Sequence, residues 1–226
     1  MNTDRRAMVI GGLGLLLMAI LAPIAQFGVL DGLIVDGDAQ KTAHNIAASQ
    51  GSFVFAVGSF LIVAVLDVVV AAALYVVLRP VNRPLSALAA LLRIVYAALF
   101  ALAILNLVSV ASMAGGAESD PAATMTSVNA FQTGWDTALA VFGLSLLVLG
   151  IVVVQAGWGR RIVGVLVIAS SIGYMVDGFG RILSSDYSLK LATFTFIGEV
   201  VLMVWLLWKG FRGGAPTSAT VSKQEV

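Results

Sequence analysis

The chain has 226 residues, of which 60% are hydrophobic and 11% charged, against about a quarter charged in a typical soluble domain. A water-soluble chain of this length cannot bury so much apolar surface, so lipid must be the solvent for most of it. The formal net charge is +1, without the basic excess that would indicate a nucleic-acid partner.

The residue counts also exclude several kinds of chemistry. Cysteine is absent, which excludes disulfides, thiol nucleophiles and iron–sulfur clusters. His44 is the single histidine, which excludes bis-histidine haem, a three-histidine zinc site and a helix-borne HExxH motif. We therefore expect no metal site and no cofactor.

Six segments are long and apolar enough to cross the hydrocarbon core, which takes about 20 residues of helix. The predicted spans are residues 7–29, 52–78, 85–113, 130–155, 161–180 and 191–211. They predict an all-α, polytopic transmembrane helix bundle that forms a single domain over residues 1–212. The first span is too long for a signal-peptide core and no clean cleavage site follows it, so we expect it to be retained. Residues 213–226 are rich in Gly, Ala, Ser and Thr, which predicts a disordered tail.

The connections between the spans alternate between basic and acidic. Nine basic residues share one side, namely Arg5, Arg6, Arg79, Arg83, Arg160, Arg161, Lys209, Arg212 and Lys223. The positive-inside rule predicts that this side, with both termini, is cytoplasmic. We therefore expect a multi-pass protein of a cytoplasmic membrane.

Two of the basic connections are tight turns. Pro80 and Pro84 end the second helix before the third begins, because proline cannot continue a helix. Gly157-Trp158-Gly159 separates the fourth helix from the fifth in the same way. Both pairs are expected to be antiparallel hairpins. On the other side, residues 37–51 are predicted to form a short surface helix and residues 114–127 a loop.

Five ionisable residues lie inside the predicted spans, where each costs about 2.5–3.5 kcal/mol near a helix centre. They are Asp67, Arg93, Asp136, Asp177 and Glu199. Asp67 and Arg93 lie on helices joined by a tight turn. At 1.5 Å per residue, Asp67 lies about 16 Å and Arg93 about 12 Å along its helix from the end at that turn. We predict that they form an intramembrane ion pair, which either locks the hairpin or acts as a gate or relay.

The other three carboxylates fall in the predicted outer half. Asp177 and Arg181 are four residues apart on one helix face. Three carboxylates near one guanidinium imply a protonated carboxyl, a bound cation or a ligand that donates hydrogen bonds. We therefore predict a candidate ligand pocket formed by Asp136, Tyr174, Asp177, Arg181 and Glu199. This single pocket requires Asp136 and Glu199 to face each other.

Several motifs in these segments resemble one protein family. They are ALYVVLRPVNR (73–83), LLRIV (91–95), GWD (134–136), FGL (142–144), RIVGVL (161–166), GYMVD (173–177) and WLLWKG (205–210). Together they resemble the DUF4386 family of bacterial integral membrane proteins, over most of residues 7–212. The resemblance implies six or seven membrane helices, a bacterial cytoplasmic (inner) membrane and no established catalytic residues.

Three functions remain open at this point. The first is binding or transport of a small amphiphile, lipid or ion at the outer pocket. The second is a structural or regulatory membrane subunit without its own ligand. The third is a metal-independent intramembrane enzyme that uses two carboxylates as acid and base; nothing else in the sequence favours it, so we do not expect an enzyme. Membrane lipids are the expected partners, and the oligomeric state is left open.

Overall fold

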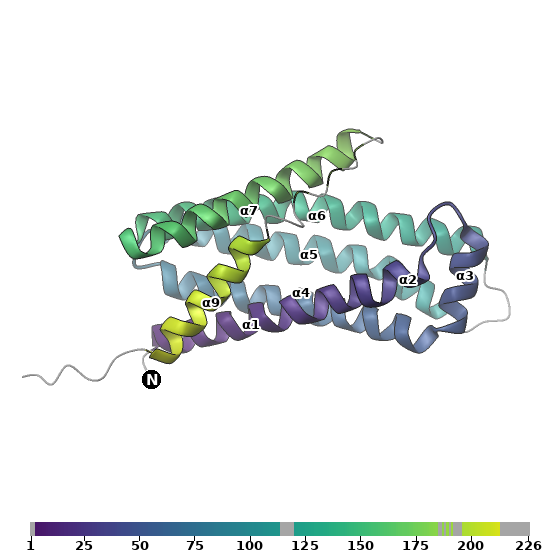
Figure 1. The fold of residues 1–226 in the computed structure, drawn as a ribbon, viewed down its shortest axis with the longest axis horizontal. Helices are drawn as coiled ribbons and strands as arrows, with labels where there is room; N and C mark the ends of the chain where they lie inside the picture. The colour runs from purple at the N-terminus through teal and green to yellow at the C-terminus, as the bar shows by residue number, and fades with distance from the viewer. Residues whose placement is uncertain are drawn as a thin grey trace, which may run out of the picture.

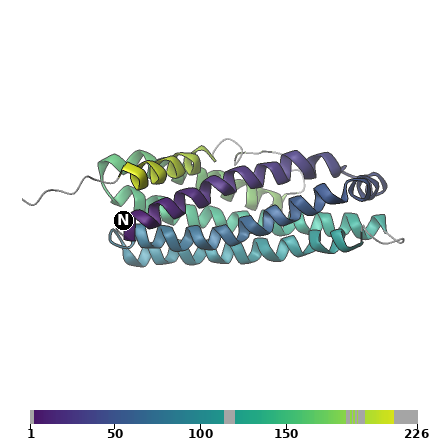
Figure 2. The ribbon, with the colours of Figure 1, turned by 90° about the horizontal axis from the view of Figure 1, so that it is seen from below.

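The computed structural model describes residues 3–113, 120–184, 187, 189, 191 and 196–212. Every regular element in this part of the chain is a helix, which confirms the predicted all-α bundle (Figures 1 and 2). In chain order the elements are α1 (Thr3–Ala25), η1 (Gln26–Leu30), α2 (Asp31–Leu33), α3 (Ala39–Ala48), α4 (Gln50–Leu78), α5 (Arg83–Met113), α6 (Pro121–Gln155), α7 (Trp158–Leu183) and α9 (Ile197–Arg212). The tail predicted to be disordered lies outside the described residues.

Five helical stretches among the described residues are long and apolar enough to cross a membrane. They are Thr3–Leu33, Gln50–Leu78, Arg83–Met113, Pro121–Gln155 and Arg161–Leu183, and they overlap the first five predicted spans. The sixth predicted span corresponds to α9, whose 16 residues extend about 24 Å at 1.5 Å per residue. That is less than the roughly 30 Å of a hydrocarbon core. α9 begins within the bundle and ends beside the start of α1 (Figure 1).

Two spans are longer than predicted, for identifiable reasons. Pro23 lies inside α1 and lacks a backbone donor, but it does not end the helix: a π-helical turn (η1) follows it and the helical stretch continues to Leu33. α6 begins at Pro121, within the stretch predicted to be a loop. Asp120 caps it by accepting a hydrogen bond from the Ala122 amide at 2.9 Å, and proline suits the first helical turn.

The two predicted tight turns and the predicted surface helix are confirmed. Residues 79–82 join α4 to α5, and Gly157 joins α6 to α7 with a φ of +113°, a conformation that favours glycine. At the opposite end, α3 is the predicted surface helix. Asp38 caps it by accepting a hydrogen bond from the Lys41 amide at 2.9 Å.

The first and last described helices are held together at their ends. Arg5 Nε donates to the carbonyl of Gly210 at 2.7 Å, and its Nη2 donates to the carbonyl of Phe211 at 3.0 Å. A guanidinium placed there satisfies carbonyls that the end of α9 leaves without intrahelical partners. Both ends therefore lie on the same side as the two hairpin turns, hereafter the turn side (Figure 1).

Glycines set the spacing between α6 and α7. A Cβ atom added at Gly150 would lie 2.9 Å from the carbonyl oxygen of Gly164, and one at Gly178 would lie 2.8 Å from the backbone nitrogen of Ala140. Small residues allow the two backbones this close approach, as is common between membrane helices. The contact fixes the register of α7 against α6, and with it the polar residues that both helices carry.

Candidate functional site

Asp67 and Arg93 meet in the interior of the bundle. Arg93 Nη2 lies 2.7 Å from Asp67 Oδ1, and the two side chains are 3% and 0% exposed. On α4, Asp67 lies between the buried Ala64 and Ala71, one turn away on either side. These small side chains on the same helix face leave room for the guanidinium.

Some buried hydrogen-bond donors and acceptors of this pair are unsatisfied. Asp67 Oδ1 and Arg93 Nη2 are close but poorly aligned for a hydrogen bond, and no described residue bonds to Asp67 Oδ2 or Arg93 Nε. Arg93 Cζ also lies 5.0 Å from the centre of the Phe142 ring, a cation–π distance. The guanidinium is thus held between one carboxylate and one ring while two buried polar atoms stay unpaired.

Glu199, in the first turn of α9, belongs to the same centre. Its carboxylate hydrogen bonds with the Tyr174 hydroxyl, and Arg93 and Asp67 are the charged groups that act on it. Its neighbour Gly198 makes this placement possible, because a Cβ there would overlap the carbonyl of Leu166 on α7. The start of α9 therefore lies directly on the backbone of α7.

Aromatic rings complete this buried charged centre. The Phe142 ring centre lies 4.6 Å from that of Tyr96 and 5.1 Å from that of Tyr174. Five helices contribute its six members, which are Asp67, Arg93, Tyr96, Phe142, Tyr174 and Glu199. With both carboxylates ionised, the centre carries one negative charge more than its guanidinium balances.

Asp136 and Arg181 form a separate pair nearer the surface of the bundle. Arg181 Nη1 lies 2.5 Å from Asp136 Oδ1, and the Arg181 and Asp136 side chains are 36% and 16% exposed. The pair bridges α7 and α6. Exposed ion pairs of this kind contribute about 0–1 kcal/mol to stability.

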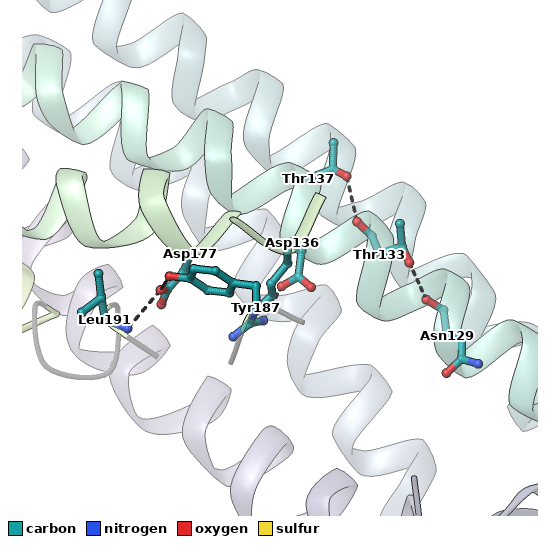
Figure 3. Close-up of polar contacts among 8 residues, drawn as sticks. Asn129, Thr133, Asp136, Thr137, Asp177, Tyr187 and Leu191 are labelled. Carbon is teal, nitrogen blue, oxygen red and sulfur yellow. Dashed lines mark hydrogen bonds and ion pairs between the residues drawn. The ribbon is translucent and has the colours of Figure 1, made fainter. Parts of the chain in front are cut away.

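Asp177 holds the connection between α7 and α9. Its Oδ1 accepts hydrogen bonds from the Tyr187 hydroxyl at 2.6 Å and from the Leu191 amide at 3.0 Å (Figure 3). The Tyr187 ring lies on Gly180, where a Cβ would overlap it. Desolvation and the Asp177 carboxylate raise the pKa of Tyr187 to about 12, so its hydroxyl stays a donor at neutral pH.

The five residues predicted to share one outer pocket therefore lie in two groups. Tyr174 and Glu199 join the Asp67–Arg93 centre. Asp136, Arg181 and Asp177 stay together, since Asp136 pairs with Arg181 and the Asp177 carboxylate acts on that of Asp136, while Asp177 also anchors the connection. The predicted sixth span, drawn from residue 191, put Glu199 eight residues below the outer surface. Instead α9 begins at Ile197, inside the bundle, and Glu199 lies half-buried in its first turn.

Some members of the centre escaped the sequence prediction. Tyr96 had a usable signal, since it follows Arg93 by three residues and shares its helix face. Phe142 had only its place in the FGL motif. Tyr187, which lies outside the centre, had no signal, because its role depends on how separate segments pack. Within the described residues, no group of three or more His, Cys, Asp or Glu side chains is placed to hold a metal ion.

The fold and its buried charges define a multi-pass α-helical membrane protein. The family model of a domain of unknown function, DUF4386, matches residues 10–210. An uncharacterized protein of Archaeoglobus fulgidus is 36% identical over 154 residues, which are 68% of this chain and 82% of that relative. The chain belongs to the DUF4386 family. No solved structure matches the chain.

Proposed function

We propose that this protein binds protons at the buried charged centre and carries them across the membrane. The observation that carries this proposal is the excess of carboxylates over guanidinium groups in a site where Asp67 and Arg93 are buried and Glu199 is half-buried. A net charge inside a membrane is costly, and ionisable residues there commonly serve proton relays. Binding one proton makes the centre neutral, and releasing it restores the negative charge.

Glu199 is the proposed proton carrier. Asp67 is in direct contact with Arg93, so the guanidinium already has its counter-charge. Glu199 is partnered by a neutral hydroxyl, that of Tyr174. Of the two carboxylates, Glu199 is therefore the one that gains more by becoming neutral.

A proton suits this centre better than a metal cation or an amphiphile. Arg93 would repel a metal cation at a distance where two carboxylates alone would attract it. A proton binds on the carboxylate itself and needs no cavity. The proton is an ion, which is one of the ligand classes expected from the sequence, but its site lies in the interior of the bundle and not in the outer half.

The membrane setting is part of the same proposal. Apolar side chains such as Ile10, Leu13 and Ile20 of α1 are exposed on the bundle, as lipid-facing residues would be. We place the protein in the cytoplasmic (inner) membrane of a bacterium, with the turn side and its arginines in the cytoplasm. Lipids are then its surrounding partners.

The competing function is a structural or regulatory subunit whose charges only fix the helix register. The direct contact between Asp67 and Arg93 favours it, since the pair joins two helices of one hairpin. The two functions differ at Glu199, which a register lock does not need. A substitution there separates them.

The test is proton flux into proteoliposomes that contain a pH-sensitive dye, driven by a potassium gradient and valinomycin. We expect wild-type protein to acidify the lumen faster than protein-free liposomes. Glu199→Gln should lower that rate to that of protein-free liposomes, because an amide cannot carry the proton. Asp136→Asn is the matched control, a carboxylate outside the centre, and should leave the rate unchanged.

Two results would refute proton carriage. One is wild-type flux no faster than that of protein-free liposomes at either polarity of the potential. The other is an undiminished rate in Glu199→Gln. Either would favour the subunit function.

A further inference from the structure

We infer that water reaches the buried charged centre from the turn side of the bundle, while a layer of aromatic side chains closes the opposite side. In naming the route of the proton this inference rests on the proposed function. The accessibility that it asserts is measurable without any proton flux.

A small, mostly apolar cavity with a few polar side chains in its wall adjoins Arg93 on the turn side. Its volume is about 10 Å³, and the polar side chains in its lining are Ser86, Arg93 and Ser145, from α5 and α6, and Tyr75 of α4. A cavity of this size holds about one water molecule, which needs two to four polar partners. Within the described residues, Ser86 Oγ and Arg93 Nε have no hydrogen-bond partner. Ser145 Oγ donates to the Phe142 carbonyl at 2.7 Å and can still accept.

The same lining leads toward the turn between α4 and α5. Ser86 lies in the first turn of α5, and Arg93 follows two turns later on the same face. The side chains between them on that helix are Ala89 and Ala90, which are small, and Tyr75 of α4 lines the cavity from the other wall. Tyr75 and Ala90 are partly exposed. Arg93 is thus about 15 Å from the start of α5 and about 10 Å from Ser86, and Leu74, Leu78 and Leu149 line the same cavity from the other walls.

On the opposite side of Arg93 the neighbouring side chains are aromatic. The ring centres of Tyr96 and Phe100 are 5.9 Å apart, and the Phe60 ring lies 5.7 Å from both Phe100 and Phe131. Trp135 lies within 5.4 Å of all three of these phenylalanine rings. The three phenylalanines are at most 1% exposed. These rings fill the space between α4, α5 and α6 with groups that hold water poorly, so they form a barrier.

The native chain has no cysteine, so a single introduced thiol reports the accessibility of its own position. Ser86→Cys and Ser145→Cys place thiols at the cavity. Ser59→Cys is the matched control, since Ser59 is a buried serine beside Phe60, at the aromatic barrier. Asn82→Cys, in the turn between α4 and α5, reports through an impermeant maleimide which side of a membrane vesicle the turns face.

The probe is the silver ion, which follows narrow water paths and blocks thiols. We expect silver added on the turn side to block most of the later maleimide labelling, in denaturant, of Ser86→Cys and Ser145→Cys. The Ser59→Cys thiol should stay unblocked under the same conditions. Silver added on the other side should block none of the three.

Equal protection of all three thiols, or blocking only from the side opposite the turns, would overturn the inferred route. This failure is distinct from failure of the proposed function. If the thiols are blocked but the protein shows no proton flux, the water route stands and proton carriage is refuted. Flux without blocking would keep proton carriage and refute this route.

Discussion

Removing one partner of the Asp67–Arg93 pair should destabilise the protein far more than neutralising Glu199. At a separation of 2.7 Å and an effective dielectric constant of about 20, Coulomb's law gives an attraction of about 6 kcal/mol. Asp67→Asn forfeits this attraction and leaves the guanidinium buried, so we expect the free energy of unfolding to fall by about 3–5 kcal/mol. Glu199 remains as a more distant counter-charge, which favours the lower end of that range.

Glu199→Gln removes only the carboxylate in excess of the guanidinium. The amide keeps an oxygen that accepts from the Tyr174 hydroxyl, so we expect a change within about 1 kcal/mol. Both free energies are measured by reversible unfolding in mixed micelles, followed by tryptophan fluorescence. The double variant Asp67→Asn with Arg93→Gln removes both charges of the pair and should recover most of the loss.

Equal losses in Asp67→Asn and Glu199→Gln would refute this assignment of partners. So would a double variant no more stable than Asp67→Asn. If Asp67→Asn does not fold, the stability of the double variant relative to wild type still decides the matter, because no unpaired guanidinium is left in it.

Three further predictions concern parts of the fold outside the centre. The pKa of Tyr187 is raised on folding to about 12, so its stabilising contribution is complete below about pH 10 and is lost as the pH rises through about 12. Unfolding temperatures measured from about pH 9 to about pH 12 should show this loss in wild type and not in Tyr187→Phe. Gly150→Ala presses a methyl group against α7 and should cost about 1–3 kcal/mol, whereas Gly51→Ala, which meets open space, should not destabilise; equal unfolding temperatures would contradict the close contact. Arg5→Ala removes two hydrogen bonds to the end of α9, so it should lower the free energy of unfolding by about 1 kcal/mol and speed proteolysis of that end. An unchanged cleavage rate would argue against these hydrogen bonds.

Much of the helix arrangement could be predicted from hydrophobic length and helix-breaking residues. The prolines after Leu78 and the glycine at Gly157 stop one helix and reverse the chain, and both act locally. The depth of Asp67 and Arg93 followed from counting residues from that turn. Local signals and a fixed rise per residue were enough for these features.

The position of Glu199 could not be predicted in this way. Hydrophobicity indicates that a segment lies in the membrane, but it does not say where in the membrane the helix begins. The start of α9 depends on Gly198 fitting against α7 and on Asp177 holding Tyr187 and Leu191. These are contacts between residues far apart in the sequence, so no window along the chain contains them.

The beginning of α6 shows a different failure. Asp120 and Pro121 form a recognisable capping pattern, but the residues around them are small and polar and favoured a loop. A cap signal close to such residues therefore carries more information than the average polarity of the segment.

Infrared difference spectroscopy tests most directly whether Glu199 holds a proton inside the bundle, because a protonated carboxyl group has its own carbonyl stretching band. With the protein in membranes, we predict a band that disappears as the pH is raised, that is absent from Glu199→Gln and that persists in Asp136→Asn. A wild-type spectrum without a titrating carboxyl band, or the same titrating band in Glu199→Gln, would contradict the proposed role of the buried charged centre.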